Sequence, residues 1–150
     1  MWCSKMNHYI YKVIYLTLGM SLAVLAKADL AVIVHPNNPI KSLSHKDVQR
    51  LFLGRSLMFP STETKIYAID HKENSQVYSR FYTDVIKMNS NKLKKYRAYY
   101  LFSGKGRLPL ILDKPADVID RVAATENSIS YVNSSDISDR VKVVFIMTTK

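Results

Sequence analysis

The stretch KIYAIDHKENSQVYSRFYTDV, residues 65–85, decides the fold that we expect for this chain. Its first six residues alternate and carry aliphatic and aromatic side chains, which favours a short strand. Apolar side chains then recur at positions 77, 81 and 85, and this spacing predicts a helix with one buried stripe that includes Phe81. Between them, the polar residues 71–74 predict a turn that ends at Ser75, a residue type preferred at helix N-caps.

A helix that follows a polar turn in this way can bind an anion at its start. The first backbone N–H groups of the helix point outward, and the positive end of the helix dipole lies beside them. The candidate ligand-binding residues are His71, Asn74, Ser75, Gln76 and, one turn into the helix, Arg80. The alternative is that Ser75 only caps its helix, because most helix N-termini bind nothing but water.

Residues 1–28 have the features of a secretory signal peptide. Basic residues precede an apolar run at 13–25, and Ala26-Lys27-Ala28 supplies the small residues typical of a cleavage site. The run is shorter than the ~20 residues that span a bilayer, which argues against a membrane anchor. We therefore expect cleavage after Ala28 and a periplasmic protein with no stable membrane insertion.

Cleavage would change the chemistry of the chain that remains. The only cysteine, Cys3, would leave with the signal, so that residues 29–150 could form no disulfide and no thiolate metal site. Three lysines would leave as well, which lowers the formal net charge from +10 to +7. A charge of this sign suits phosphate, lipid headgroups, nucleic acid or an acidic partner. With no internal repeat or flexible linker, residues 29–150 are expected to form one domain.

The remaining pattern alternates strands with helices. Residues 30–34 form a continuous apolar run, typical of a strand in a parallel sheet that is covered on both faces. Helices are expected from Ser44, Ser90 and near Asp113, and further strands at 129–132 and 141–147. Strands separated by helices imply crossover connections, so we expect an α/β fold with a mixed, mostly parallel sheet flanked by helices.

The sequence contains no recognisable enzyme motif. It has no G-x-S-x-G, no H-E-x-x-H and no Walker loop. The histidines at 35, 45 and 71 belong to different predicted elements and lack the spacing of metal ligands. No nucleophile–base pair is visible either. We expect a non-enzymatic protein that uses no cofactor and no metal.

A glycine-containing loop, Ser103-Gly-Lys-Gly, is a second place where an anion could bind. Its backbone N–H groups and the Lys105 ammonium could contact phosphate, although the glycines could equally serve only to end a helix. Basic and aromatic residues mix throughout residues 92–107, as in some nucleic-acid-binding proteins. Here the aromatic residues fall largely at helical core spacing, so we expect no nucleic-acid partner.

Six stretches of the chain resemble the phosphate-binding-protein-like family, which is related to the periplasmic substrate-binding protein of the phosphate ABC transporter. They are LAVIVHPNNP, LSHKDVQRLFLG, KIYAIDHKENSQVYSRFYTDVI, YRAYYLFSGKGRLP, DVIDRVAATENSISYV and the final strand. They cover nearly all of residues 29–150. The resemblance implies a single lobe of a type II periplasmic-binding-protein-like fold, phosphate as the first candidate ligand, and an ABC transporter or another envelope protein as a partner.

The chain departs from the family at the phosphate motif. The family's Arg, Asp and Ser-Gly-Thr correspond here to His71, Glu73 and Ser75-Gln76-Val77, so that only the serine is kept. A single lobe also cannot enclose a ligand. We therefore expect weak binding of phosphate or another small anion. The rival interpretation is a periplasmic interaction platform that kept the fold and lost ligand binding.

Overall fold

The computed structural model describes residues 29–104 and 107–148. The expected signal peptide and Lys105 therefore lie outside the described residues. Within the described ranges, no helix combines the length and the apolar character that a membrane crossing requires.

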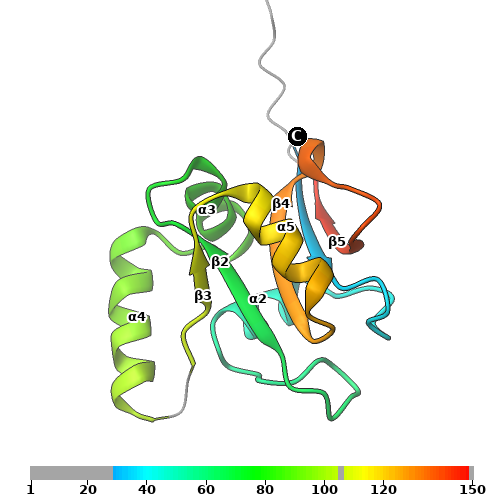
Figure 1. Ribbon diagram of the computed structural model, residues 1–150. Helices are drawn as coiled ribbons and strands as arrows, with labels where there is room; N and C mark the ends of the chain where they lie inside the picture. The colour runs from blue at the N-terminus through cyan, green and yellow to red at the C-terminus, as the bar shows by residue number, and fades with distance from the viewer. Residues whose placement is uncertain (1–28, 105–106, 149–150) are drawn as a thin grey trace, which may run out of the picture.

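A five-stranded sheet lies at the centre of the fold, in the order β3-β2-β4-β1-β5 (Figure 1). The strands are β1 (Leu30–Val34), β2 (Tyr67–His71), β3 (Leu110–Leu112), β4 (Ser128–Asn133) and β5 (Lys142–Met147). Strand β2 pairs in parallel with β3 and β4, whereas β1 is antiparallel to both β4 and β5. Four strands thus run in one direction and β1 runs against them, which confirms the expected mixed, mostly parallel sheet.

Strand β1 is buried as expected, but its neighbours differ from those that we expected. All five of its residues are buried, and Val32 and Ile33 belong to core clusters on opposite faces of the sheet. Both neighbouring strands are antiparallel, so the expectation of parallel neighbours was wrong. A continuous apolar run indicates that both faces of the strand are covered. It does not indicate the direction of the neighbouring strands.

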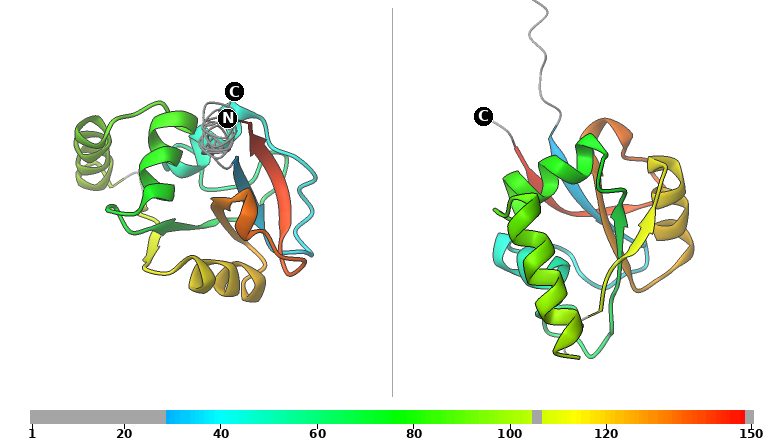
Figure 2. Two further views of the ribbon diagram at one scale, coloured as in Figure 1. Left: turned by 90° about the horizontal axis from the view of Figure 1, so that it is seen from above. Right: turned by 90° about the vertical axis from the view of Figure 1, so that its left-hand side faces the viewer.

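Helices cover both faces of the sheet (Figures 1 and 2). The larger core cluster packs one face against α2 (His45–Phe52), α3 (Gln76–Arg80), the π-helical turn η1 (Phe81–Val85) and α4 (Ser90–Phe102). The smaller cluster packs the other face against α5 (Pro115–Ala124). A short 3-10 turn, η2 (Ser134–Asp136), follows β4.

The helix starts follow the sequence signals closely. Ser44 and Asp47 form a reciprocal capping box at α2, with the Asp47 N–H donating to Ser44 Oγ at 3.2 Å. Pro115 occupies the first turn of α5, where proline is favoured. At α4 the cap is Asn89 in place of the expected Ser90, and its Oδ1 accepts a hydrogen bond from the Lys92 N–H at 2.9 Å.

The central strand–turn–helix is present, with one shift in its boundaries. Strand β2 extends to His71, so the first residue of the expected turn belongs to the strand. Helix α3 continues directly into η1, which makes residues 76–85 helical. The expected buried stripe is confirmed, because Phe81 is fully buried and stacks on Tyr131 with a ring-centroid distance of 3.6 Å.

Candidate functional site

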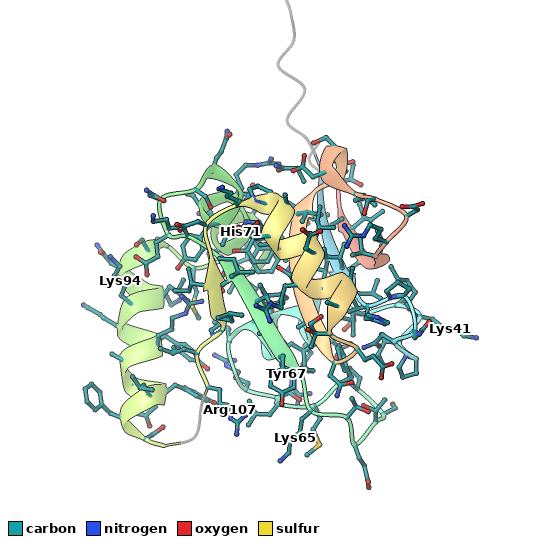
Figure 3. The ribbon with its side chains drawn as sticks, viewed as in Figure 1. Lys41, Lys65, Tyr67, His71, Lys94 and Arg107 are labelled. Carbon is teal, nitrogen blue, oxygen red and sulfur yellow. The ribbon has the colours of Figure 1, made fainter. Side chains whose placement is uncertain are left out.

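The turn between β2 and α3 lies at an edge of the sheet that commonly binds ligands. Strands β2, β3 and β4 are parallel, so their carboxyl ends meet at this edge (Figure 3). In open α/β sheets, ligands bind outside the carboxyl ends of the strands. The position of the turn is therefore suitable for a binding site, and its detailed geometry decides what it can bind.

The structure brings three of the sequence-derived site residues together on the turn. Asn74 and Gln76 are exposed and Ser75 is half-buried between them. The Ser75 N–H donates to the Lys72 carbonyl at 2.9 Å, and Ser75 Oγ accepts from the Tyr78 N–H at 3.3 Å. Ser75 thus caps the helix, and the outward surface of the turn remains open to solvent.

His71 points into the protein and away from that surface. Its side chain is 1% exposed, and Nε2 lies 2.6 Å from the Tyr131 carbonyl oxygen. A carbonyl accepts, so Nε2 carries the proton that is donated. Burial lowers the pKa of His71 below 6.5, which favours the neutral ring. The imidazole therefore connects β2 to β4, and the structure does not place it beside Asn74 and Gln76.

Arg80 reaches the end of β4. Its Nη1 donates to Asn133 Oδ1 at 3.2 Å, and Asn133 in turn donates to Asp136 at 3.3 Å. Two lysines form ion pairs with acidic residues at or near the turn: Lys72 lies 3.2 Å from Asp113, and Lys94 lies 3.5 Å from Glu73. The positive charge around the turn is thus partly compensated by exposed carboxylates.

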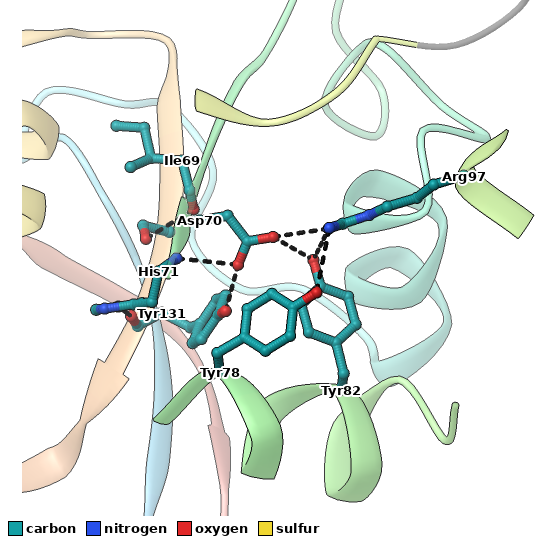
Figure 4. Close-up of polar contacts among 8 residues, drawn as sticks. Ile69, Asp70, His71, Tyr78, Tyr82, Arg97 and Tyr131 are labelled. Carbon is teal, nitrogen blue, oxygen red and sulfur yellow. Dashed lines mark hydrogen bonds and ion pairs between the residues drawn. The ribbon is translucent and has the colours of Figure 1, made fainter. Parts of the chain in front are cut away.

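A buried polar network beneath the turn was missed at the sequence level (Figure 4). Its centre is Asp70, which is fully buried on β2. Asp70 Oδ2 lies 2.7 Å from Arg97 Nη2 and accepts from the Tyr82 hydroxyl at 2.7 Å. Asp70 Oδ1 accepts from the Tyr131 hydroxyl and from the His71 N–H. Four groups, from α4, η1, β4 and β2 itself, thus satisfy one carboxylate.

Arg97 completes this network from α4. Its Nη2 also donates to the Tyr82 hydroxyl at 2.6 Å and its Nη1 to the Tyr78 hydroxyl at 3.2 Å. The guanidinium carbon lies 5.0 Å from the centroid of the Tyr82 ring, within cation–π range. Burial raises the pKa of Tyr78 to about 12, so this phenol stays neutral. The network is satisfied internally, and it therefore holds α4 and α3 on the sheet.

Among residues 29–104 and 107–148, no cluster of three or more His, Cys, Asp or Glu side chains could hold an ion. What the turn offers is an exposed helix start with polar side chains, which suits a small oxyanion better than an apolar ligand.

Solved structures with the same fold include receptors for phosphate transport. An ABC-type phosphate transport receptor from Vibrio cholerae matches with a TM-score of 0.64 at 14% identity, over 78% of this chain and 46% of that one. A putative phosphate ABC transporter substrate-binding protein with bound phosphate, from Clostridium perfringens, matches with a TM-score of 0.63 at 20% identity, over 78% and 45%. PstS from Borrelia burgdorferi matches with a TM-score of 0.60 at 16% identity, over 78% and 47%.

These likenesses confirm the fold expected from the resemblance. The chain spans less than half the length of each of these three proteins. No protein-family model matches the chain. No curated protein matches it in sequence.

Proposed function

We propose that this chain is an exported, non-enzymatic module that binds a small anion weakly at the turn of Asn74, Ser75 and Gln76. Inorganic phosphate is the first candidate, because the neighbours named above are phosphate transport proteins. The observation that carries the proposal is the position of this turn, between the carboxyl end of a parallel strand and the start of a helix. Lys105 is a second proposed contact.

The helix start supplies the attraction in this proposal. Because α3 continues into η1, peptide dipoles along residues 76–85 add to the positive end at Ser75. An exposed charge at such a position gains about 0.3–1 kcal/mol. Hydrogen bonds from backbone N–H groups to a charged acceptor add about 1.5–3 kcal/mol each before the ligand's own ordering is counted.

Three features keep the affinity low. The turn is open to solvent, so the anion keeps part of its hydration. His71 is buried and neutral, so it adds no positive charge to the site. We propose that it supports the turn from the interior of the protein. Arg80 is engaged with Asn133, and Glu73 adds a negative charge to the turn. We expect millimolar binding, which corresponds to about −4 kcal/mol.

Calorimetric titration with phosphate, sulfate and nitrate tests the proposal. Ser75→Asp places a negative charge on the proposed site and should abolish phosphate binding. Ser79→Asp is the matched control, because Ser79 is exposed one turn later on the same helix and should tolerate the same change. Equal phosphate binding by both variants would contradict the site, and no binding at tens of millimolar would contradict the function.

One observation favours the rival function, an interaction platform for a transporter subunit or another envelope protein. Helix α4 carries Tyr99, Leu101 and Phe102 at its carboxyl end, with Phe102 88% exposed. Exposed apolar side chains that gather in this way often mark a protein contact. A photo-crosslinking side chain at position 102 in living cells should capture one defined envelope protein under this rival function. The same side chain at Thr83, which is also exposed, is the control.

A further inference from the structure

A groove of about 560 Å³ lies around the amino-terminal half of β2, away from the Ser75 turn. Its lining residues come from the end of α2 and the loop that follows it, from β2 and the residue before it, from residues 107–110, and from the end of α5. They include Phe52, Tyr67, Leu108, Leu110 and Arg121. Figure 3 shows Tyr67 and Arg107 in the lower half of the molecule, with His71 in the upper half. The groove and the proposed anion site thus lie at opposite ends of one strand.

The groove exists because β3 is short. Strand β3 pairs with β2 only from Ile69 to His71, so Tyr67 and Ala68 have no partner strand on that side. The chain just before β3, residues 107–109, lines the groove and does not continue the pairing. The same segment passes close to the end of α2, since a Cβ on Gly54 would lie 3.6 Å from the Arg107 carbonyl oxygen.

The walls of the groove expose apolar side chains to water. Tyr67 is 57% exposed and Leu108 is 53% exposed, and Leu57 and Leu110 are also exposed large hydrophobic residues. Covering this surface would be favourable, because apolar area removed from water is the main source of binding free energy. Pockets of this size with mostly apolar walls and a few polar groups are typical of sites for small organic ligands.

Among the described residues that line the groove, the charged side chains are all positive. Arg107 and Arg121 line it, and no aspartate or glutamate does. Within the described part of the chain, neither guanidinium group forms a hydrogen bond or an ion pair, whereas those of Arg97 and Arg140 each have an aspartate partner. Two guanidinium groups without a carboxylate, next to an apolar surface, complement a ligand that is both apolar and anionic.

We infer that this groove binds a small amphipathic carboxylate, with an alkyl or aryl body against the leucines and Tyr67 and the carboxylate on Arg107 and Arg121. A guanidinium group can donate two parallel hydrogen bonds to a carboxylate, which gives such a ligand an orientation as well as affinity. Inorganic phosphate has no apolar body, so this site differs in ligand class from the proposed site at Ser75.

Titration of the purified protein with octanoate, followed by calorimetry and by displacement of anilinonaphthalene sulfonate, tests the inference. Octanoate should bind saturably, and octanol, which lacks the charge, should bind at least tenfold more weakly. The double variant Arg107→Gln/Arg121→Gln should weaken octanoate binding at least tenfold. Arg140→Gln is the control for charge, since Arg140 is exposed and lies outside the groove.

A second pair of variants tests the apolar wall. Leu108→Ala should weaken octanoate binding several-fold, whereas Ile146→Ala, at a residue of similar exposure on β5, should leave it unchanged. Circular dichroism establishes that each variant is folded. Octanoate binding that survives the double arginine variant would overturn the inference, as would octanol binding as tightly as octanoate. Binding only to anionic phospholipid vesicles would also overturn it, because the partner would then be a membrane surface.

Discussion

The Arg97 guanidinium lies 2.7 Å from the Asp70 carboxylate and joins α4 to β2 through a buried ion pair. The Asp70 side chain is fully buried and that of Arg97 is 16% exposed. Helix α4 has one buried residue, Leu93, and its Tyr96 hydroxyl accepts a hydrogen bond from Arg55 at 3.1 Å. The ion pair is therefore a principal attachment of α4.

Removing one partner of this pair should destabilise the fold strongly. Arg97→Met would leave the Asp70 carboxylate buried without its cation, and the expected loss in the free energy of unfolding is about 3–5 kcal/mol. Arg140→Met is the control, because it breaks an ion pair with Asp120 whose side chains are both more than half exposed, and it should cost less than about 1 kcal/mol. Urea unfolding followed by circular dichroism measures both. Equal losses would mean that the buried pair adds nothing to stability.

Phe81 should be among the most sensitive positions of the core. It is fully buried and stacks on Tyr131, and it also contacts Phe52 edge to face with a ring-centroid distance of 4.8 Å. Phe81→Ala should lower the free energy of unfolding by about 3–5 kcal/mol. Phe102→Ala, at an exposed position, should change it by about 0.5 kcal/mol or less. A loss below about 1 kcal/mol for Phe81→Ala would contradict the packing described here.

Acidification should destabilise the fold through His71. Burial lowers its pKa in the folded state below 6.5, so the unfolded chain binds the proton more readily than the folded one. The stabilising contribution is fully present above pH 6.5 and is lost as pH falls through the folded pKa. An NMR titration of the His71 ring should give a midpoint below 6.5. A midpoint at or above that value would show that the ring is not held neutral in the core.

Alkaline pH should destabilise the fold through Tyr78. Its pKa is raised from 10.0 to about 12, chiefly by burial, so folding favours the neutral phenol. This contribution to stability is present below pH 10.0 and is lost as pH rises through about 12. Ultraviolet absorbance should show a late tyrosine ionisation that is missing in Tyr78→Phe. An unchanged titration curve in that variant would contradict the assignment.

Local sequence signals predicted most of the fold, because each resides within one element. The Ser44 cap, the buried run of β1 and the stripe through Phe81 could all be identified from neighbouring residues. The direction of β1 could not, since it depends on strands whose paired residues are 95 to 117 positions away in sequence, from Val34–Ile129 to Leu30–Met147. Strand β3 was missed because its three residues are too few to form a pattern.

The candidate site could be predicted only in part. The turn and the Ser75 cap follow from local sequence, and both are present. The inward orientation of His71 could not be foreseen, because its partner is the backbone of Tyr131 on another strand. The Asp70 network left a weak signal, an acidic residue within an apolar strand, but its partner Arg97 is 27 residues away. Hydrogen-bond and ion-pair partners that are this far apart in sequence are determined by the packing of the folded chain.

The most direct test of the central claim is an amide NMR titration of the protein with inorganic phosphate. If the turn binds the anion, the largest phosphate-dependent shifts should fall on the backbone amides of Asn74, Ser75 and Gln76, with millimolar saturation, and should vanish in Ser75→Asp. Shifts spread evenly over exposed lysines, or shifts at the turn that persist in Ser75→Asp, would contradict the proposed anion site.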